Sequence, residues 1–287
     1  MVIREQVPTA ISLAELDLGR NSRFDLHMHT SMSDGQHSPD EVLQRCAAGR
    51  LDVVAITDHD LSGPLHPGLW QLDGRRVYLI AGAELTGVHE GREFHLLTYF
   101  PGPIPEGFRA FCQRQCHARA RRYDAIIELL ELAIPKAGED AHDGDRALTS
   151  HHLAREIVAR GFAGSRGEAF RDFIGPQRRK IPTPFVSLVE AISTARAHGG
   201  ITSWAHPDIR DVERHIATLA RAGLQGIEGL RPNLSRSDTR ALRGLARRHG
   251  LFLTGGSDWH GWTEPALGGF GLEAQQLSGF LDALRAA

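Results

Sequence analysis

The chain has 287 residues, of which 41% are hydrophobic and 24% charged, so it can bury a core and lacks the composition of a disordered protein. Its net charge is −2 and its pI is near 6.8, which excludes a general electrostatic attraction to nucleic acid or anionic membranes. No apolar run could span a bilayer, and the first residues lack the layout of a secretory signal, so we expect a cytoplasmic protein.

The first part of the chain predicts short strands separated by a helix. Residues 23–28 (RFDLHM) are typical of a strand, and Ser38-Pro39-Asp40-Glu41 then provides the cap, proline and acids that begin a helix. That helix ends near Gly49, and strands are expected over 52–57 and 77–85. Residues 92–100 are either the second strand of a hairpin turned at 90–91 or a separate barrel strand, and the sequence leaves both open.

The middle of the chain predicts helices only. They are expected over 106–133, 149–160 and 165–174, with a polar loop at 136–145. We interpret residues 106–185 as an all-helical insertion that caps the site.

The alternation of strands and helices then resumes. Helices are expected over 187–198, 211–222 and 237–249, and strands over 201–205, 226–230 and 251–256. This alternation predicts an α/β fold with a parallel sheet, and the length favours a closed barrel over an open doubly wound sheet. No glycine-rich phosphate loop follows the first strand, as an open sheet of that kind would require. We therefore expect a barrel of residues 24–105 and 186–287, preceded by an N-terminal extension, residues 1–23.

Histidines and acids gather at the carboxyl ends of the predicted strands. His27 and His29 are two residues apart in a strand, so their side chains point the same way. The other strand ends carry Asp58, His59, Asp60, Glu84, His206, Asp258 and His260. Each residue alone would most often be an ordinary hydrogen-bonded loop residue. Together, at the end of the barrel where active sites form, they would be an unpaired polar cluster unless a metal organised them.

The predicted site therefore binds metal. Imidazoles and carboxylates without a thiolate suit Mn²⁺, Zn²⁺ or Fe²⁺ better than Ca²⁺ or a structural zinc. The candidates exceed what one ion can use, so two or three divalent ions are expected, and Glu84 is suited to bridge them. If residues 92–100 belong to a hairpin, His95 pairs across from Thr86 and lies on the same face as Glu84.

At these residues the sequence resembles the PHP (polymerase and histidinol phosphatase) family of metal-dependent phosphoesterases. The matching motifs are HMHTSMSDG, AITDHD, GAELTG with HLLTYF, AHPD and TGGSDWHG, spread between residues 24 and 270. The resemblance implies a distorted (β/α)7 barrel with a trinuclear site. It assigns one ion to His27, His29, Glu84 and Asp258. A second ion would share Glu84 and add His95 and His206, and a third would use Asp34, His59 and His260.

Asp34 stands where some family members carry a histidine, which makes the chain similar to the branch of stand-alone nucleotide and oligonucleotide phosphatases. That branch usually carries Arg-Pro-His in its insertion, whereas this chain has Ser150-His151-His152. We expect substrate to be bound by His152, Arg178, Arg179 and Lys180. For the three basic residues a solvated loop is an equal alternative.

The implied reaction is hydrolysis of phosphate esters of nucleotides, for example 3',5'-bisphosphates, or of short oligonucleotides. The expected catalytic residues are Glu84, His206 and His260, with one of the two histidines protonating the leaving oxygen. Asp60 and Ser257 are expected to orient the ligands. The expected partner is a small phosphorylated substrate, with no membrane and no stable nucleic-acid partner.

Other functions fit part of this pattern. A histidinol-phosphate, sugar-phosphate or cyclic-phosphate phosphatase would use the same metal chemistry. An amidohydrolase-type enzyme also has His-x-His on its first barrel strand, but it often needs a barrel lysine, and Lys136 and Lys180 both lie in the insertion. A non-catalytic binding module would not need the full ligand set.

Overall fold

A nine-stranded sheet forms the centre of the structure, a computed structural model that describes residues 8–262 and 265–287. Residues 1–7 of the predicted N-terminal extension lie outside the described residues. The strand order is β8-β7-β6-β5-β4-β2-β1-β9, and β3 pairs with β4 outside this path. The strands are β1 (Arg23–Asp25), β2 (Val53–Ile56), β3 (Gly68–Leu72), β4 (Arg75–His89), β5 (Arg92–Phe100), β6 (Ile201–Trp204), β7 (Gly226–Leu230), β8 (Phe252–Gly255) and β9 (Leu272–Glu273).

The two ends of the sheet meet, which makes it a nearly closed, distorted α/β barrel. The backbone N–H of Leu26, just after β1, donates to the carbonyl of Gly255 at the end of β8 (3.3 Å). The N–H of Asp258 donates to the carbonyl of His27 in the same seam (2.9 Å). The expected barrel is confirmed, and the seam lies where ligands from the start and the end of the chain meet.

The expected parallel pairing holds for β1 with β2, β2 with β4, β6 with β7 and β7 with β8. The middle of the sheet differs, because β4 and β5 form a long antiparallel hairpin and β5 also pairs antiparallel with β6. The hairpin turn at Glu90 and Gly91 has φ values of 48° and 75°, the left-handed backbone typical of a tight hairpin turn. Both interpretations of residues 92–100 are therefore correct, since β5 is a hairpin strand and a barrel strand.

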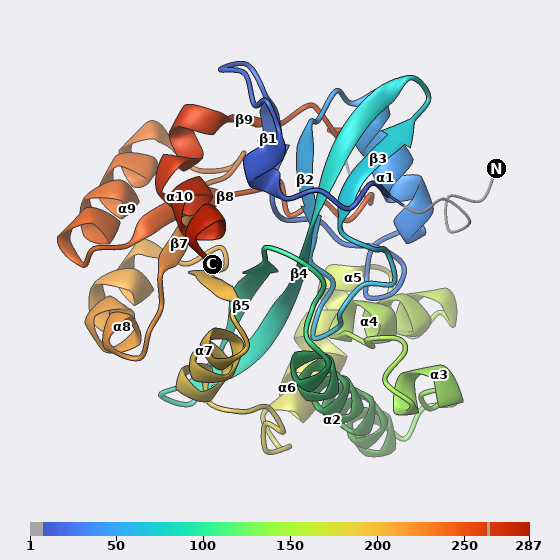
Figure 1. The fold of residues 1–287 in the computed structure, drawn as a ribbon. Coiled ribbons are helices and arrows are strands. Elements are labelled where there is room, and N and C mark those ends of the chain that lie inside the picture. Colours follow the sequence, from blue (N-terminus) through green and yellow to red (C-terminus); the bar gives the residue numbers. More distant parts are fainter. Residues whose placement is uncertain (1–7, 263–264) are drawn as a thin grey trace.

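Helices cover the outside of this sheet, and Figure 1 shows α7, α8 and α9 beside the strands β5 to β8. The helices with predicted counterparts here are α1 (Pro39–Ala48), α7 (Leu188–Ala197), α8 (Ile209–Arg221) and α9 (Arg236–Arg248). The predicted caps are real for α1 and α7, because Ser38 and Ser187 each accept a hydrogen bond from the N–H three residues on. Leu188, Ile192 and Leu242 are fully buried against the sheet.

Between β5 and α7 the described chain is helical, as predicted, and lies at the lower right of Figure 1. Its elements are α2 (Glu106–Leu130), α3 (Glu139–His142), α4 (Ser150–Ala159), α5 (Arg166–Glu168), a π-helix (Ala169–Ile174) and α6 (Gly175–Arg178). These helices bury a core of their own around Ile126, Leu153 and Ile157. The single helix expected over 165–174 is instead split by the wider π turn, which precedes Pro176, a residue with no N–H to donate.

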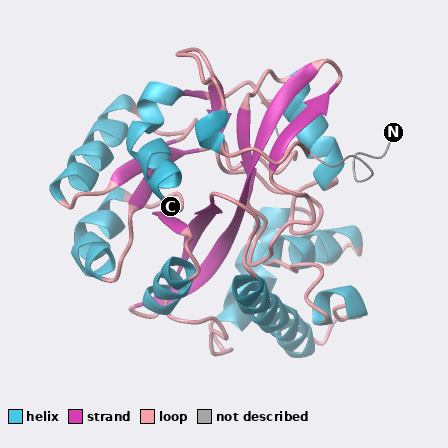
Figure 2. Ribbon diagram, viewed as in Figure 1, coloured by secondary structure: helices cyan, strands magenta, loops and turns pink. Residues whose placement is uncertain are grey.

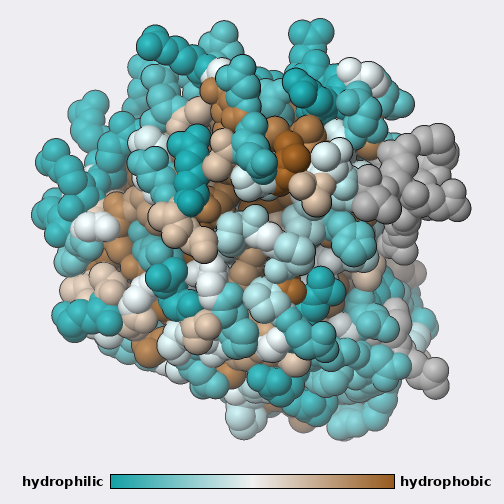
Figure 3. Space-filling model, viewed as in Figure 1, coloured by the Kyte–Doolittle hydropathy of each residue, from teal (hydrophilic) through white to brown (hydrophobic). Residues whose placement is uncertain are grey.

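Several elements had no counterpart in the sequence prediction. They are β3, β9, α3, α10 (Ser278–Ala286) and two short 3-10 helices (Leu13–Glu15 and Ala274–Leu277). The described part of the N-terminal extension packs on the barrel, with Leu13 buried and Thr9 bridged to Leu69. None of the described helices has the length and apolar character needed to cross a membrane. Helices flank the strands at the left and lower right of Figure 2, and polar residues occupy most of the visible surface in Figure 3.

Candidate metal centre and substrate cavity

The residues predicted to bind metal lie together at the carboxyl ends of the barrel strands. They are His27, His29, Asp34, His59, Glu84, His95, His206, Asp258 and His260. Strand pairing continues past the ends of the strands, with isolated bridges from His59 to Glu84 and from Met28 to Trp259. The paired backbone of the barrel, and not unpaired loops, therefore fixes the spacing of the ligands.

Glu84 is fully buried at the centre of this group. Five imidazole nitrogens lie within 3.4 Å of its carboxylate oxygens, those of His27, His29, His59, His95 and His206. The shortest distances are 2.9 Å, from Oε1 to His206 Nε2 and from Oε2 to His59 Nδ1. Since its two oxygens face different sets of histidines, Glu84 has the position that a bridging carboxylate needs.

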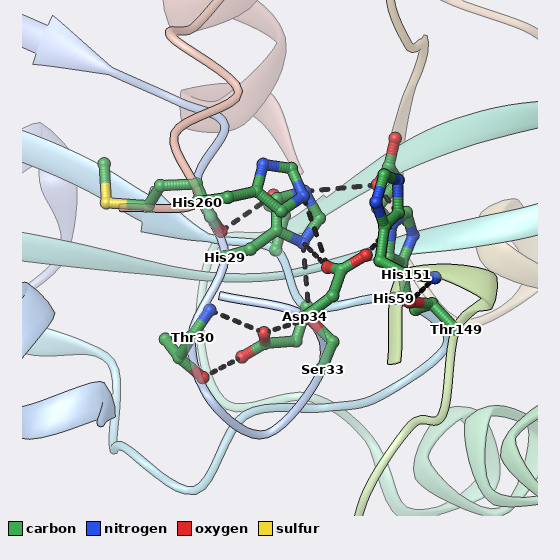
Figure 4. A network of polar contacts seen from close by, with 12 residues as sticks. His29, Thr30, Ser33, Asp34, His59, Thr149, His151 and His260 are labelled. Carbon is green, nitrogen blue, oxygen red and sulfur yellow. Dashed lines mark hydrogen bonds and ion pairs between the residues drawn. The ribbon is translucent and has the colours of Figure 1, made fainter. Parts of the chain in front are cut away.

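Asp34 forms the centre of a second group, shown in Figure 4. Its Oδ1 lies 3.2 Å from His260 Nε2, and its Oδ2 lies 3.7 Å from His59 Nε2. His29 Nδ1 is 3.8 Å from Oδ1. Asp258 lies at a third place, with Oδ1 at 3.3 Å from the Nε2 atoms of both His27 and His29.

The side chains present fit divalent metal ions. Both carboxylate oxygens of Asp34 and the Oε2 atom of Glu84 are buried and have no hydrogen-bond partner within the described residues. A buried carboxylate without hydrogen-bond donors is costly unless a cation neutralises it. Within this centre, three groups of ligand atoms lie within 4.8 Å of one another: His29-Asp34-His59-His260, His27-His29-Asp258 and His59-Glu84-His95. His29 and His59 therefore each lie in two of these groups, whereas the sequence analysis assigned each of them to a single ion.

The charges of the site are arranged to receive cations. Burial opposes ionisation of Glu84, but the neighbouring His59, His95 and His27 hold the pKa of its carboxyl well below the usual range. The same balance of burial against nearby histidines lowers the pKa of Asp34. Burial also disfavours the charged form of His260, yet its contacts with Asp34 and Asp258 raise the pKa of its ring to about 9. The carboxylates therefore stay ionised at neutral pH.

Two buried acids that the sequence analysis did not assign hold the ligands in place. Glu228, in β7, has Oε1 at 2.9 Å from His27 Nδ1 and accepts from the backbone N–H of His206 (2.7 Å). Asp58 accepts from the hydroxyls of Thr30 and Ser33, in the turn that leads to Asp34. Glu228 is the single charged residue in the strand GIEGL, whose other residues are apolar or glycine, and this could have marked it as functional in the sequence.

The backbone is strained or crowded at several ligands. Asp60, His206 and Asp258 have φ values of 49°, 30° and 53°, a left-handed conformation that is costly for these residues and typical of functional sites. A Cβ atom at Gly256 would lie 2.5 Å from the backbone nitrogen of His27, so only glycine lets the end of β8 approach the first ligand.

Asp60 and Ser257 bind the framework next to the ligands. The carboxylate of Asp60 accepts from the N–H of Thr86 (2.7 Å) and from Arg119 Nε (2.5 Å). The N–H of Ser257 donates to Asp25 Oδ1 (2.8 Å), which also accepts from the N–H of His27. Both residues therefore act on the backbone beside a ligand, and an orienting role for them stays a prediction.

A cavity of about 160 Å³ opens beside Asp34, His59 and His95 and leads towards the helical segment. Three arginines line it, Arg119, Arg122 and Arg178, together with His151 and Phe185. Arg122 and Arg178 each hold one oxygen of Glu93 at 2.7 Å, while the buried Nε of Arg122 has no hydrogen-bond partner within the described residues. The guanidinium groups of Arg119 and Arg122 also lie over the ring of Phe185, at 5.4 and 5.5 Å.

Only part of the predicted substrate-binding set reaches this cavity. Arg178 lines it, but His152 is directed elsewhere, since its Nδ1 accepts from the N–H of Thr149 (3.1 Å) at the start of α4. The neighbouring His151 projects towards the ligands instead (Figure 4). Arg179 and Lys180 are exposed and do not line the cavity, because α6 ends at Arg178 and the chain turns away there.

Several known proteins are similar to this chain in sequence and in fold. Residues 25–166 match the PHP domain. The chain is 30% identical over 248 residues to the 5'-3' exoribonuclease Rnm of Escherichia coli K12, covering 83% of this chain and 85% of that protein. It is 29% identical over 250 residues to the 3',5'-nucleoside bisphosphate phosphatase of Chromobacterium violaceum, covering 83% and 87%. A solved structure described as a metal-dependent phosphoesterase from Bifidobacterium adolescentis has a TM-score of 0.72 and 27% identity, covering 91% and 96%.

Proposed function

Because this chain belongs to the PHP family of metal-dependent phosphoesterases, we propose that it hydrolyses phosphate esters of nucleotides or of short oligonucleotides. The observation that carries the substrate class is the arginine-lined cavity beside the ligand group. Three guanidinium groups line it, and the carboxylate that lines it outside the ligand group is that of Glu93, held by Arg122 and Arg178. Arginine suits phosphate because its planar group can donate two parallel hydrogen bonds.

We assign two to three ions of Mn²⁺, Zn²⁺ or Fe²⁺ to the metal centre. Their ligands would be His27, His29, Glu84 and Asp258 for one, Glu84, His95 and His206 for another, and Asp34, His59 and His260 for the third. Bound divalent ions lower the pKa of a water molecule and neutralise charge on phosphoryl oxygens.

The chain's own residues complete the reaction. Glu84 keeps the two halves of the ligand group together from its buried position. The side chains of His206, His95 and His260 are 31%, 26% and 25% exposed, and of these we assign His206 and His260 as the candidate proton donors. Whichever of these two histidines is not fully engaged by metal would donate a proton to the leaving oxygen. The reaction would take place in the cytoplasm, on a small phosphorylated substrate.

Residues 106–185 would select this substrate, because they contribute every arginine of the cavity. In this division, residues 24–105 and 186–287 form the barrel and residues 1–23 an N-terminal extension. The two curated relatives act, by their names, on RNA from its 5' end and on nucleoside 3',5'-bisphosphates. Three arginines suit such multiply charged substrates better than histidinol phosphate or a sugar phosphate, which carry one phosphate.

A phosphate-release screen tests this proposal. The protein, loaded with Mn²⁺, is assayed with adenosine 3',5'-bisphosphate, a 5'-phosphorylated dinucleotide, histidinol phosphate, glucose 6-phosphate and p-nitrophenyl phosphate. One of the two nucleotide substrates should have the highest kcat/KM. A higher value for histidinol phosphate or glucose 6-phosphate would refute the substrate class, and no hydrolysis with Mn²⁺, Zn²⁺ or Fe²⁺ would refute the phosphoesterase role.

A further inference from the structure

A second hollow opens onto the ligand group at Asp258 and His260. Its volume is about 250 Å³, and its lining shares no residue with the arginine-lined cavity. It is bordered by the segment after β7, with Arg231 and Asn233, and by residues 265–268 and 270. The ligand group is therefore open to two separate spaces, one at His59 and His95 and the other at Asp258 and His260.

Arg231 is the arginine of this second hollow, whose described lining also includes the carboxylates of Asp25 and Asp258. It directly follows β7, at the carboxyl end of the barrel where the other ligands lie. One terminal nitrogen donates to the carbonyl of Pro207 (3.2 Å), which holds the side chain in place. Its Nε is buried without a hydrogen-bond partner, and Arg231 forms no ion pair within the described residues.

The guanidinium group of Arg231 is suited to bind an anion that has several oxygen atoms. Beyond its hydrogen bond to Pro207, the guanidinium of Arg231 has further N–H donors that suit a phosphate oxygen. Asp25 is fully buried behind the wall of the same hollow, where its Oδ1 accepts from the N–H groups of His27 and Ser257. The anion-binding group of the hollow is therefore Arg231, and a second phosphate close to the ligand group is the chemistry of an oligonucleotide.

We propose that this hollow, named here the Arg231 hollow, holds the second nucleotide of an oligonucleotide whose first nucleotide occupies the arginine-lined cavity. The inference rests on the proposed function and makes its substrate more specific. A nucleoside bisphosphate fills only the first space, whereas a phosphodiester has a nucleotide on both sides of the scissile phosphate. Arg231 then contributes to the binding of chains of two or more nucleotides and not to the binding of mononucleotides.

The test compares three substrates in one set of variants. Arg231→Ala should lower kcat/KM for a 5'-phosphorylated ribodinucleotide about 10- to 100-fold, as expected for the loss of charge-assisted hydrogen bonds. The values for adenosine 3',5'-bisphosphate and p-nitrophenyl phosphate should change much less. Arg243→Ala, at an exposed position on α9, is the matched control and should leave all three unchanged.

A second variant tests the space itself. Ala266 is exposed and lines the hollow, so Ala266→Trp would fill it without removing a charge. It should also lower activity on the dinucleotide selectively, and unchanged metal content and melting temperature would show that both variants fold.

Equal losses on all three substrates with Arg231→Ala, or unchanged dinucleotide hydrolysis in both variants, would overturn this inference and leave the proposed function standing. Hydrolysis of the bisphosphate but not the dinucleotide by the unmodified protein would also overturn it. Failure to hydrolyse any of the three would instead be the failure of the proposed function.

Discussion

Replacing Glu84 by glutamine should empty the metal centre while leaving the shape of the site intact. The two side chains are nearly isosteric, but glutamine is neutral. Glu84 is fully buried and has five imidazole nitrogens within 3.4 Å, so no water can compensate for the lost charge. Removing one partner of a buried ion pair costs about 3–5 kcal/mol. At 1.4 kcal/mol per factor of ten, this corresponds to a loss of metal affinity of about 100- to 4,000-fold.

The assay is elemental analysis of Glu84→Gln after dialysis against metal-free buffer, followed by turnover of the best substrate. We expect less than half of the wild-type metal content and a loss of activity of at least about 100-fold. Glu93→Gln is the matched control, because Glu93 lies on the same cavity but binds Arg122 and Arg178 rather than imidazoles. It should keep its metal. Wild-type metal content and turnover in Glu84→Gln would refute the bridging role.

Three further predictions follow from the same structure. Removal of metal with EDTA should lower the melting temperature by about 5–10 °C, because an ion at 100 times its Kd stabilises the folded protein by about 2.7 kcal/mol. Calorimetry with and without added Mn²⁺ measures the shift, and an unchanged melting temperature would contradict the metal site. Arg122→Ala should raise KM for the nucleotide substrate about 10- to 100-fold, whereas the exposed Arg179→Ala should not, and equal effects in initial-rate assays would argue against the cavity as the binding site. Burial lowers the pKa of His152 to about 4 in the folded protein. In the unfolded chain the same ring has a pKa of about 6.5, so between pH 6.5 and pH 4 protonation favours the unfolded state and the free energy of unfolding falls. The variant His152→Gln keeps a side chain that can cap α4. Between pH 7 and pH 5 its free energy of unfolding, measured by urea titration, should fall by about 2 kcal/mol less than that of the wild type. Equal falls in the two proteins would refute the lowered pKa of His152.

The sequence predicted those parts of the fold in which local signals and tertiary structure agree. The helix beginning at Ser38 has a cap, a proline and first-turn acids, and it lies within one residue of its expected start. The strands β3 and β9 were missed for different reasons. β3 forms a hairpin with β4 across the two-residue turn Asp73-Gly74, a local signal that the sequence analysis did not use. β9 has only two residues, paired with β1 from the other end of the chain, and no sequence pattern records such pairing.

The clustering of the candidate ligands could be predicted because they are titratable residues at the ends of apolar strands, which stand out in a single sequence. The residues around them could not. Glu228 looked like one acid in a strand, and its contact with His27 spans 201 positions of the chain. In the insertion, one of three consecutive basic residues lines the cavity, because the end of α6 decides that Arg178 faces it and Arg179 does not. Local composition carries no information about that choice.

The seam between β1 and β8 has a consequence for the synthesis of this protein. His27 leaves the ribosome early, but Asp258 and His260, which complete the ligand group, follow 231 and 233 positions later. The hydrogen bond from Leu26 to Gly255 that closes the seam also needs nearly the whole chain. A nascent chain therefore exposes isolated histidines and acids that hold an ion weakly. Full metal loading waits until translation is almost finished, so bound metal marks a completed barrel.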